Sequence, residues 1–253
     1  MSLLEAAVVL LAGFAAGTIN TLVGSGTLIT FPTLLAVGLP PVTANVTNNV
    51  GLVPGAVSGT LAGRPELVGQ GLLVRRLAPA SLLGGALGAV LLLVLPASAF
   101  RAIVPALITL GVVLVALQPR ISGWVAHRHE ALGGLPIGGA WWVWPAVLLA
   151  GVYGGYFGAA QGVLLMAILG NGVADTLQRL NATKNLLSSV VNGVAAVLFV
   201  LWEHIEWPVA ALVAAGAVVG GQVGARVARR LPSGVLRAVI VAVGLVALVA
   251  LLR

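Results

Sequence analysis

The sequence has no cysteine, and only 8% of its 253 residues are charged. The absence of cysteine excludes disulfide bonds and thiolate metal sites, and it says nothing about the redox compartment. So low a charge content excludes an ordinary soluble domain, in which about a quarter of the residues are charged. Among the charged residues the acidic ones are the scarcer, with 6 Asp and Glu against 13 Lys and Arg. Most of the chain is therefore expected to lie away from water.

Apolar residues replace the missing charge. Hydrophobic side chains make up 60% of the sequence, the mean hydropathy is +1.12, and apolar runs recur from Leu3 to the C-terminus. A helix needs about 18 or more such residues to cross a hydrocarbon core of about 30 Å. The runs are continuous, whereas the strands of a membrane barrel alternate apolar and polar residues. The sequence therefore predicts an all-α polytopic membrane protein surrounded by a lipid bilayer.

The basic residues lie in short clusters between the apolar runs. This pattern is typical of cytoplasmic loops under the positive-inside rule, so the net charge of +7 does not indicate a nucleic-acid partner. The spans contain no pair of carboxylates and no pair of histidines, because His127, His129 and His204 fall in predicted loops. We therefore expect no catalytic set, no metal site and no cofactor, and we do not expect an enzyme.

The apolar units fall into two halves of similar order. Each half begins with one long unit and one short apolar piece, and three longer units follow. The units of the first half are Leu3–Val23, Leu28–Leu39, Val42–Leu61, Leu72–Leu95 and Ala99–Leu117, and those of the second are Trp141–Ala160, Val163–Leu169, Thr176–Trp202, Trp207–Leu231 and Val235–Leu252. We therefore expect a first repeat over residues 1–118, a linker over 119–140 and a second repeat over 141–253.

Individual residues repeat together with the hydropathy. The glycines of the first unit recur 138 positions later, and the landmarks after the short piece recur 136 positions later. The pairs are Gly13, Gly17 and Gly24 with Gly151, Gly155 and Gly162; Asn45, Thr47 and Asn49 with Asn181, Thr183 and Asn185; and Gly84, Gly85, Gly88, Pro96 and Arg101 with Gly220, Gly221, Gly224, Pro232 and Arg237. This regularity predicts a duplication, which is typical of transporters. The segments "GGALG" and "GGQVG" predict close helix packing.

The charges of the loops predict that the two repeats are inverted. The first half has Arg64, Arg75 and Arg76 where the second half has the acidic segment "EHIEW", and the next connection reverses this difference. Inversion requires an odd number of crossings in each half. The short pieces of about 12 residues cover only about 18 Å. We therefore predict a re-entrant helical hairpin plus three transmembrane helices in each half; the alternative is eight full spans in parallel repeats.

The tips of the predicted hairpins are "NTLVGSGTL" (Asn20–Leu28) and "GGYFGAAQG" (Gly154–Gly162). Glycine permits a sharp turn and a close approach of a ligand to the backbone. Irregular backbone at membrane depth must be buried in protein or line a wet cavity. Each short piece would then begin a half-helix whose free N–H groups point inward, and two such ends would form an anion site.

A polar stripe lies inside the second half. Asn181, Lys184 or Asn185, Ser188 and Asn192 follow one another at helical spacing and therefore share one face. Lys184 lies nine residues after Asp175, near the middle of the hydrocarbon core. A lysine there costs about 2.5–3.5 kcal/mol on insertion scales, so an anionic ligand would compensate it. Two alternatives stay open: Lys184 pairs with Asp175 or with backbone carbonyls, and the asparagines only cross-link helices.

The residues also carry a resemblance to a known family. The segment "AGTINTLVGSGTLITFPTLLAVGLPPVTANVTNNVGLVPG", together with "GVYGGYFGAAQGVLLMAILG" and "QRLNATKNLLSSVVNGVAAVLF", resembles the sulfite exporter TauE/SafE family of bacterial membrane proteins. The resemblance covers nearly the whole chain. It implies a secondary transporter in the bacterial cytoplasmic membrane that moves sulfite, sulfonates such as sulfoacetate, or related organic anions. Much of the family has a G-x-G-G-G run where this chain has Gly24, Ser25, Gly26 and Thr27.

We therefore expect an anion carrier whose ligand binds at the midplane, between the hairpin tips and the two Asn-x-Thr-x-Asn helices. Alternating access would come from one repeat rocking against the other. An anion channel is the alternative, and the oligomeric state, including a homo-oligomer, stays open. The expected substrate-binding residues are Lys184, Asn20, Ser25, Gly26, Thr27, Asn45, Thr47, Asn48, Asn49, Gln161, Asn181, Asn185 and Ser188.

Overall fold

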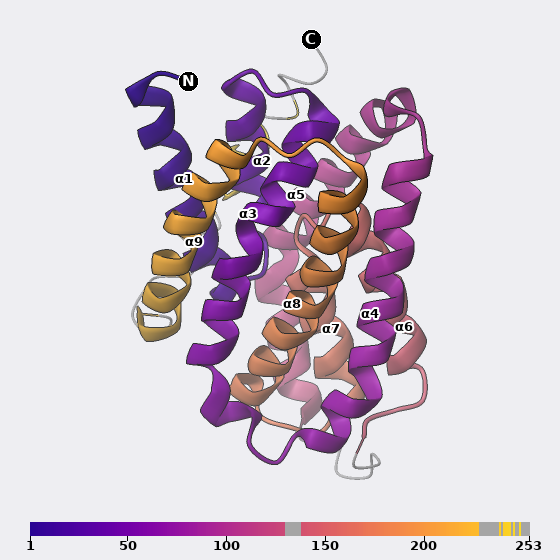
Figure 1. Cartoon of the computed structure of the whole chain (residues 1–253). Coiled ribbons are helices and arrows are strands. Elements are labelled where there is room, and N and C mark those ends of the chain that lie inside the picture. Colours follow the sequence, from indigo (N-terminus) through magenta and orange to yellow (C-terminus); the bar gives the residue numbers. More distant parts are fainter. Residues whose placement is uncertain (130–137, 228–237, 239, 244, 246–247, 249–253) are drawn as a thin grey trace.

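The structure is a computed structural model that describes residues 1–129, 138–227, 238, 240–243, 245 and 248. This part of the chain forms a bundle of helices and contains no strand (Figure 1). The elements are α1 (Leu3–Leu22), α2 (Thr27–Ala36), α3 (Pro41–Ala62), the 3-10 helix η1 (Arg64–Leu67), α4 (Gly71–Val94), α5 (Ala97–His129), α6 (Val143–Tyr156), α7 (Gln161–Gly172), α8 (Leu177–Trp202) and α9 (Trp207–Val227).

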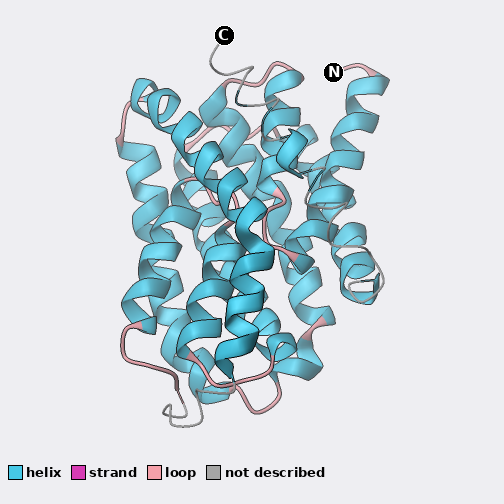
Figure 2. Ribbon diagram, turned by 180° about the vertical axis from the view of Figure 1, so that it is seen from behind, coloured by secondary structure: helices cyan, strands magenta, loops and turns pink. Residues whose placement is uncertain are grey.

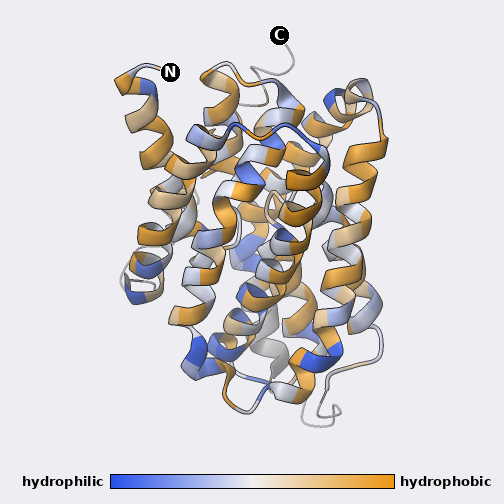
Figure 3. Cartoon of the chain, viewed as in Figure 1, coloured by the Kyte–Doolittle hydropathy of each residue, from blue (hydrophilic) through white to orange (hydrophobic). Residues whose placement is uncertain are grey.

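Five of these helices are long and apolar enough to cross a membrane. They are α1, α4, residues Ala97–Ile121 of α5, α8, and residues Trp207–Arg226 of α9. Large apolar side chains such as Leu83, Leu149 and Val197 face outward, and Figure 3 shows apolar residues along the lengths of the helices. An outer surface of this kind suits lipid and not water. The prediction of an all-helical, multi-pass membrane protein is confirmed.

Three helices are too short to cross a bilayer. α2, α6 and α7 have 10, 14 and 12 residues, or about 15–21 Å at 1.5 Å per residue. In Figure 1, α1 and α2 lie in the upper half of the bundle, and α6 and α7 lie in the lower half. α1 differs from the other hairpin helices because its 20 residues are enough for a full span. Helix length therefore supports the predicted hairpin for α6 and α7 but does not distinguish a hairpin from a span for α1.

The two interruptions have the same backbone geometry. α1 ends at Leu22 and α6 ends at Tyr156, and each is followed by a glycine in the left-handed region, Gly24 (φ 82°) and Gly158 (φ 76°). The helix ends and the two glycines are each 134 residues apart. The offset of 138 that the sequence predicted for the hairpins is therefore wrong by one helical turn. The error arose because glycines recur at every turn of these helices, so a shift by one turn still pairs glycine with glycine.

The two interruptions meet inside the bundle, where Figure 2 shows loops enclosed by helices. The backbone N–H of Gly162 donates a hydrogen bond to the carbonyl oxygen of Gly24, at 3.1 Å. A Cβ atom on Gly162 would lie 2.5 Å from the Cα of Gly24, so only glycine permits this approach. Beside them, the ring of Phe157 packs edge-on against Phe31, with 5.1 Å between centroids. The hairpin tips are therefore in direct contact.

Glycine also lets the long helices pack closely. α1 packs along α9, and α6 packs along α4. A Cβ on Gly84 would lie 3.0 Å from the Cα of Gly151, and a Cβ on Gly224 would lie 2.7 Å from the carbonyl oxygen of Thr18. Both predicted glycine seams are confirmed. Each seam joins a helix of one predicted half to a helix of the other, so neither half packs as a separate unit.

The predicted linker is partly helical. α5 continues through Gln118 to His129, which is 11 residues into the segment 119–140. Arg76 of α4 fixes the other end of this segment, because its guanidinium donates hydrogen bonds to the carbonyl oxygens of Gly138 and Gly139, at 2.7 Å each. The entrance to α6 is therefore tied to α4. Most of the predicted unit Val235–Leu252, and Arg229, Arg230, Pro232 and Arg237, lie outside the described residues.

Candidate functional site

Three side chains of α8 bind the end of α1. Asn181 and Asn185 donate to the carbonyl oxygen of Thr21, at 3.3 and 3.4 Å, and the ammonium of Lys184 lies 3.5 Å from the carbonyl oxygen of Asn20. The last carbonyls of a helix have no partner within it and carry a partial negative charge. Irregular backbone at membrane depth needs such partners from the protein or from a wet cavity. The polar stripe of α8 therefore caps an interrupted helix.

The first Asn-x-Thr-x-Asn motif has an equivalent role. Asn45 of α3 donates to the carbonyl oxygen of Tyr156, the last residue of α6, at 3.0 Å. Thr47 accepts a hydrogen bond from the N–H of Glu206, just before α9, and Thr183 of the second motif bonds Gln70, just before α4. Each motif thus binds a helix end and a helix start that belong to the other predicted half. This explains why two buried polar motifs occur.

Removing the cap on α6 should destabilise the protein. In Asn45→Ala the buried carbonyl oxygen of Tyr156 loses its donor, and an unsatisfied buried group costs about 1–3 kcal/mol. We expect a lower midpoint in thermal unfolding of the detergent-purified protein. Asn171→Ala is the matched control, because Asn171 donates only to a carbonyl of its own helix. Equal midpoints for the two variants would show that the cap of α6 contributes nothing.

Lys184 is the only lysine of the chain. Its side chain is fully buried, and the carbonyl oxygen of Asn20 is its one hydrogen-bond partner in the described part of the protein. The predicted alternative of a Lys184–Asp175 pair is wrong, because Asp175 forms its ion pair with Arg179, at 2.8 Å. The other alternative, contact with a backbone carbonyl, is observed. One long hydrogen bond leaves most of the cost of burying the ammonium uncompensated.

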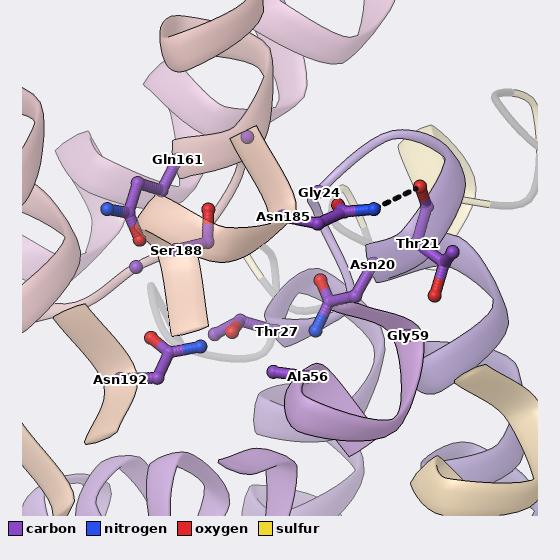
Figure 4. Close-up of a pocket in the computed structure, with 12 residues that line it drawn as sticks. Asn20, Thr21, Gly24, Thr27, Ala56, Gly59, Gln161, Asn185, Ser188 and Asn192 are labelled. Atoms are coloured by element: carbon purple, nitrogen blue, oxygen red, sulfur yellow. Dashed lines mark hydrogen bonds between the residues drawn. The ribbon is translucent and has the colours of Figure 1, made fainter. Parts of the chain in front are cut away.

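A small polar pocket, with a cavity volume of about 30 Å³, lies beside this contact (Figure 4). The hairpin tips, α3 and α8 all contribute to its wall. Lining residues are Asn20, Thr21, Gly24, Thr27, Ala56, Gly59, Gly158, Gln161, Gly162, Asn185, Ser188 and Asn192. No charged side chain is among them. Lys184 does not line the pocket, but it precedes the lining residue Asn185 in the sequence.

Several hydrogen-bond donors of the pocket are available to a ligand. The side chain of Gln161 is 3% exposed and its Nε2 has no partner, and the hydroxyl of Ser188 is buried and unpartnered as well. The carbonyl of the Asn20 side chain accepts from the N–H of Gly26, at 2.6 Å, which leaves its amino group for other contacts. Buried donors without a partner are costly unless water or a ligand satisfies them. The pocket is therefore suited to bind oxygen atoms.

The hairpin tips differ from the prediction in one respect. The N–H of Gly26 is bound by Asn20, and the N–H of Gly162 is bound by Gly24. The prediction that the starting N–H groups are free for a ligand is therefore wrong for Gly26 and Gly162. Hairpin contact makes the two backbones satisfy each other, and sequence alone could not show that the tips touch.

The structure divides the predicted site residues into two groups. Asn20, Thr27, Gln161, Asn185 and Ser188 line the pocket. Those that do not line it are Ser25, Gly26, Asn45, Thr47, Asn48, Asn49, Asn181 and Lys184. Asn48 reaches it indirectly, since it donates to the hydroxyl of Thr27 at 3.4 Å.

Two lining residues of α3, Ala56 and Gly59, were missed by sequence reasoning. They lie seven and ten residues after Asn49, on the same side of the helix. A Cβ on Gly59 would lie 2.7 Å from the hydroxyl oxygen of Thr21. Small residues at this helical spacing leave space for the pocket. Their position on the same side of the helix as Asn49 could have identified them as lining residues.

A second, larger cavity of about 350 Å³ adjoins the pocket and extends to η1. Its wall shares Thr21, Gly59 and Asn185 with the pocket. The other lining residues are Ala62, Gly63, Glu66, Gln178, Asn181, Ala182 and Ala225. The shared residues from α1, α3 and α8 place the two cavities next to each other, between the η1 end and the hairpin tips.

Comparison with known proteins assigns the chain to a family. The profile of the sulfite exporter TauE/SafE family matches residues 9–251. This chain belongs to the TauE/SafE family. The resemblance inferred from the hairpin and Asn-x-Thr-x-Asn motifs is thereby confirmed. No solved structure matches the chain significantly.

Curated relatives of this TauE/SafE protein are described as membrane transporters. It is 28% identical to the probable membrane transporter protein ORF9 of Sinorhizobium sp, over 95% of this chain and 90% of the relative. It is 27% identical to the probable membrane transporter protein YfcA of Escherichia coli strain K12, over 91% and 83%. It is 26% identical to a probable membrane transporter protein of Haemophilus influenzae, over 87% and 84%. The chain is accordingly a membrane transporter.

The two hydroxyls of the segment Gly24–Thr27 have different surroundings. Thr27 lines the pocket and is the first residue of α2. Ser25 is fully buried, its hydroxyl has no partner, and it does not line the pocket. Only Thr27 is therefore placed to contact a pocket ligand in this conformation. Among the described residues, no group of three or more His, Asp or Glu could hold a metal ion.

Proposed function

We propose that this TauE/SafE protein is a secondary transporter of small sulfur-containing or organic anions, such as sulfite or sulfoacetate, in the bacterial cytoplasmic membrane. The observation that carries the proposal is the fully buried ammonium of Lys184, which has no carboxylate partner among the described residues and contacts Asn20, a residue that lines the polar pocket. An anion in the pocket would supply the missing negative charge. At low dielectric such an attraction acts over several ångströms, so Lys184 does not need to line the pocket.

The substrate oxygens would be bound by neutral donors. Gln161, Ser188, Thr27 and the amino group of Asn20 surround the pocket, and oxyanions of sulfur present several acceptor oxygens to such groups. Asn185 and Asn181 would hold the end of α1 in place beside them. The adjoining cavity of about 350 Å³ has room for a small solute and not for a macromolecule.

Two inverted repeats would provide alternating access. Supporting observations are the cross-pairing of α1 with α9 and α6 with α4, the hairpins in opposite halves of the bundle, and the exchange of helix caps between halves. The connection after α3, which carries Arg64, lies at the lower end of Figure 1, and α9 runs downward to Arg226. The acidic loop before α9 lies at the upper end. Under the positive-inside rule the lower end is cytoplasmic. The repeats would then comprise residues 1–118 and 141–253.

A binding screen tests the proposed function. Purified protein in detergent is titrated with sulfite, sulfate, thiosulfate, sulfoacetate and a carboxylate, and with zwitterionic taurine as a charge control. We expect saturable binding of at least one sulfur oxyanion and none of taurine. Binding of taurine alone, or of none of these solutes, would contradict the proposal. Counterflow of the bound anion in proteoliposomes then distinguishes a carrier from a channel.

Gln161→Leu should weaken anion binding. The variant removes the unpartnered Nε2 from the pocket while keeping a side chain of similar size. A hydrogen bond to a charged acceptor contributes about 1.5–3 kcal/mol, so we expect a rise in Kd of about 10-fold to 100-fold. Gln118→Leu on α5 is the control and should bind as the parent does. An unchanged Kd for Gln161→Leu would exclude this amide from the site.

A further inference from the structure

The pocket is lined by equivalent residues from the two halves. Equivalent hairpin residues are 134 positions apart, and equivalent residues of α3 and α8 are 136 positions apart. Three pairs at these spacings line the pocket: Gly24 with Gly158, Thr27 with Gln161, and Ala56 with Asn192. Equivalent residues can surround one pocket only if the pocket lies close to the axis that relates the halves. An opening on one side of the pocket should therefore have an equivalent on the other side.

A third cavity occupies the equivalent place at the other end of the bundle. This upper cavity of about 300 Å³ lies between the start of α3, the end of α4, the start of α5 and the loop after α8. The cavity at the η1 end lies between the start of α8, the last turns of α9 and the connection after α3. Val42 of the upper cavity and Gln178 of the η1 cavity are 136 positions apart. Glu203 and Glu66 line the two cavities from the connections that follow α8 and α3. The two cavities therefore correspond under exchange of the halves.

Aromatic rings separate the upper cavity from the pocket. Phe157 precedes the pocket residue Gly158, and Phe100 precedes Arg101 of the upper cavity. These two rings pack with 6.2 Å between their centroids, and Phe31 packs edge-on against both, at 5.1 and 6.5 Å. All three side chains are at most 4% exposed. The rings therefore form a barrier between the pocket and the upper cavity.

The equivalent positions on the η1 side have smaller side chains. Phe157 corresponds to Val23, and Phe199, which belongs to the same buried cluster, corresponds to Gly63 in the wall of the η1 cavity. The η1 cavity accordingly shares lining residues with the pocket, whereas rings fill the equivalent space on the other side. One open side and one filled side are the arrangement of a carrier that faces one compartment.

We propose that the upper cavity is the second access site for the anion, and that Phe31, Phe100 and Phe157 form the gate between it and the pocket. The proposal rests on the proposed function, since it needs an anion that crosses through the pocket. When the carrier turns, the rings separate, the upper cavity extends to the pocket, and the η1 cavity closes. Ala195 of α8 is the equivalent of Gly59, which lines both the pocket and the η1 cavity. Ala195 is fully buried here and lines the path when the gate is open.

Single cysteines test this route, because the chain has no cysteine of its own. Each variant is treated with a small membrane-impermeant maleimide, from outside in spheroplasts and from inside in inside-out vesicles. We expect Ala195→Cys and Gly63→Cys to react from opposite sides of the membrane, since Gly63 lines the η1 cavity. Ala80→Cys is the matched control, because Ala80 is equally buried but lies in the core between α4 and α6. It should react from neither side.

A second variant tests the gate itself. Phe157→Leu removes the ring contacts with Phe31 and Phe100 and keeps an apolar side chain. Loss of these contacts weakens the closed gate, so Ala195→Cys should be labelled about fivefold faster when it is combined with Phe157→Leu. An unchanged labelling rate would overturn the assignment of the rings as the gate.

Exchange of labelled sulfite and labelled sulfoacetate in proteoliposomes links the labelling to transport. Modification of Ala195→Cys should cause a loss of exchange, because the maleimide fills the path. If Ala195→Cys exchanges either probe but stays unlabelled, or reacts from the same side as Gly63→Cys, the upper route is wrong and the transport function stands. Absence of exchange of both probes by the parent protein contradicts the anion-transport function and this proposal with it.

Discussion

Lys184→Met is expected to abolish anion binding while leaving a protein that is at least as stable as the parent. The variant removes the only buried ammonium among the described residues and keeps an unbranched apolar side chain of similar length. Without its positive charge, the pocket offers neutral donors alone. Neutral donors alone bind a desolvated anion less tightly, so the Kd should rise by at least about 100-fold, equivalent to about 2.7 kcal/mol.

Stability in the absence of anion distinguishes this role from a purely structural one. The contact of Lys184 with the carbonyl oxygen of Asn20 is long, at 3.5 Å, and contributes about 1.5 kcal/mol, the low end for a hydrogen bond of a charged group. Burial of the ammonium at the membrane centre costs about 2.5–3.5 kcal/mol on insertion scales. The cost exceeds the contribution, so removal of the charge should raise the thermal midpoint. A lysine kept only to cap α1 would instead give a lower midpoint.

Two measurements check the prediction for Lys184. Isothermal titration with sulfite and sulfoacetate gives the Kd, and thermal unfolding in detergent, with and without anion, gives the stability. Arg101→Met is the matched control, because it removes an exposed positive charge on α5, beside a separate cavity that Glu203 also lines. The control should bind as the parent does. Anion binding by Lys184→Met with unchanged affinity would remove this residue from the proposed site.

Much of the fold could be predicted because each helix is coded by a local pattern. The ends of α3, α4 and α8 lie within one residue of their predicted bounds, since proline, glycine or a polar cap marks where each apolar run begins or ends. The predicted hairpin register failed by one turn because glycine seams repeat at that interval. The extension of α5 to His129 was missed because helical residues outside the apolar core lack a hydropathy signal.

The site could be predicted less well, because its geometry depends on contacts between the two halves. Sequence identified Asn20, Gln161 and Ser188 as buried polar residues, and these line the pocket. It could not show that Asn45 and Thr47 bind helix ends of the opposite half. A buried asparagine has the same sequence signature whether it contacts a substrate or a carbonyl, and only the packing of distant helices decides between them.

Gly88→Val is expected to prevent folding. A Cβ atom at this position would overlap the carbonyl oxygen of Val152 and would lie 2.8 Å from the backbone nitrogen of Tyr156. Neither backbone atom can move without separating α4 from α6, and valine adds two further methyl groups. Overpacking a seam of this kind costs about 3 kcal/mol or more. We expect most of the protein to aggregate on detergent extraction, as measured by size-exclusion chromatography.

Gly193→Val on α8 is the control, since no heavy atom lies within 4 Å of a Cβ built there. It should yield a monodisperse protein with a midpoint close to that of the parent. Gly224→Val, 136 residues after Gly88, tests the duplication, because its Cβ would meet the carbonyl oxygen of Thr18 at 2.7 Å. If α9 packs on α1 as α4 packs on α6, Gly224→Val should fail to fold as Gly88→Val does. A stable Gly224→Val protein would mean that the two seams are not equivalent, and the cross-packed repeats proposed for alternating access would lose their symmetry.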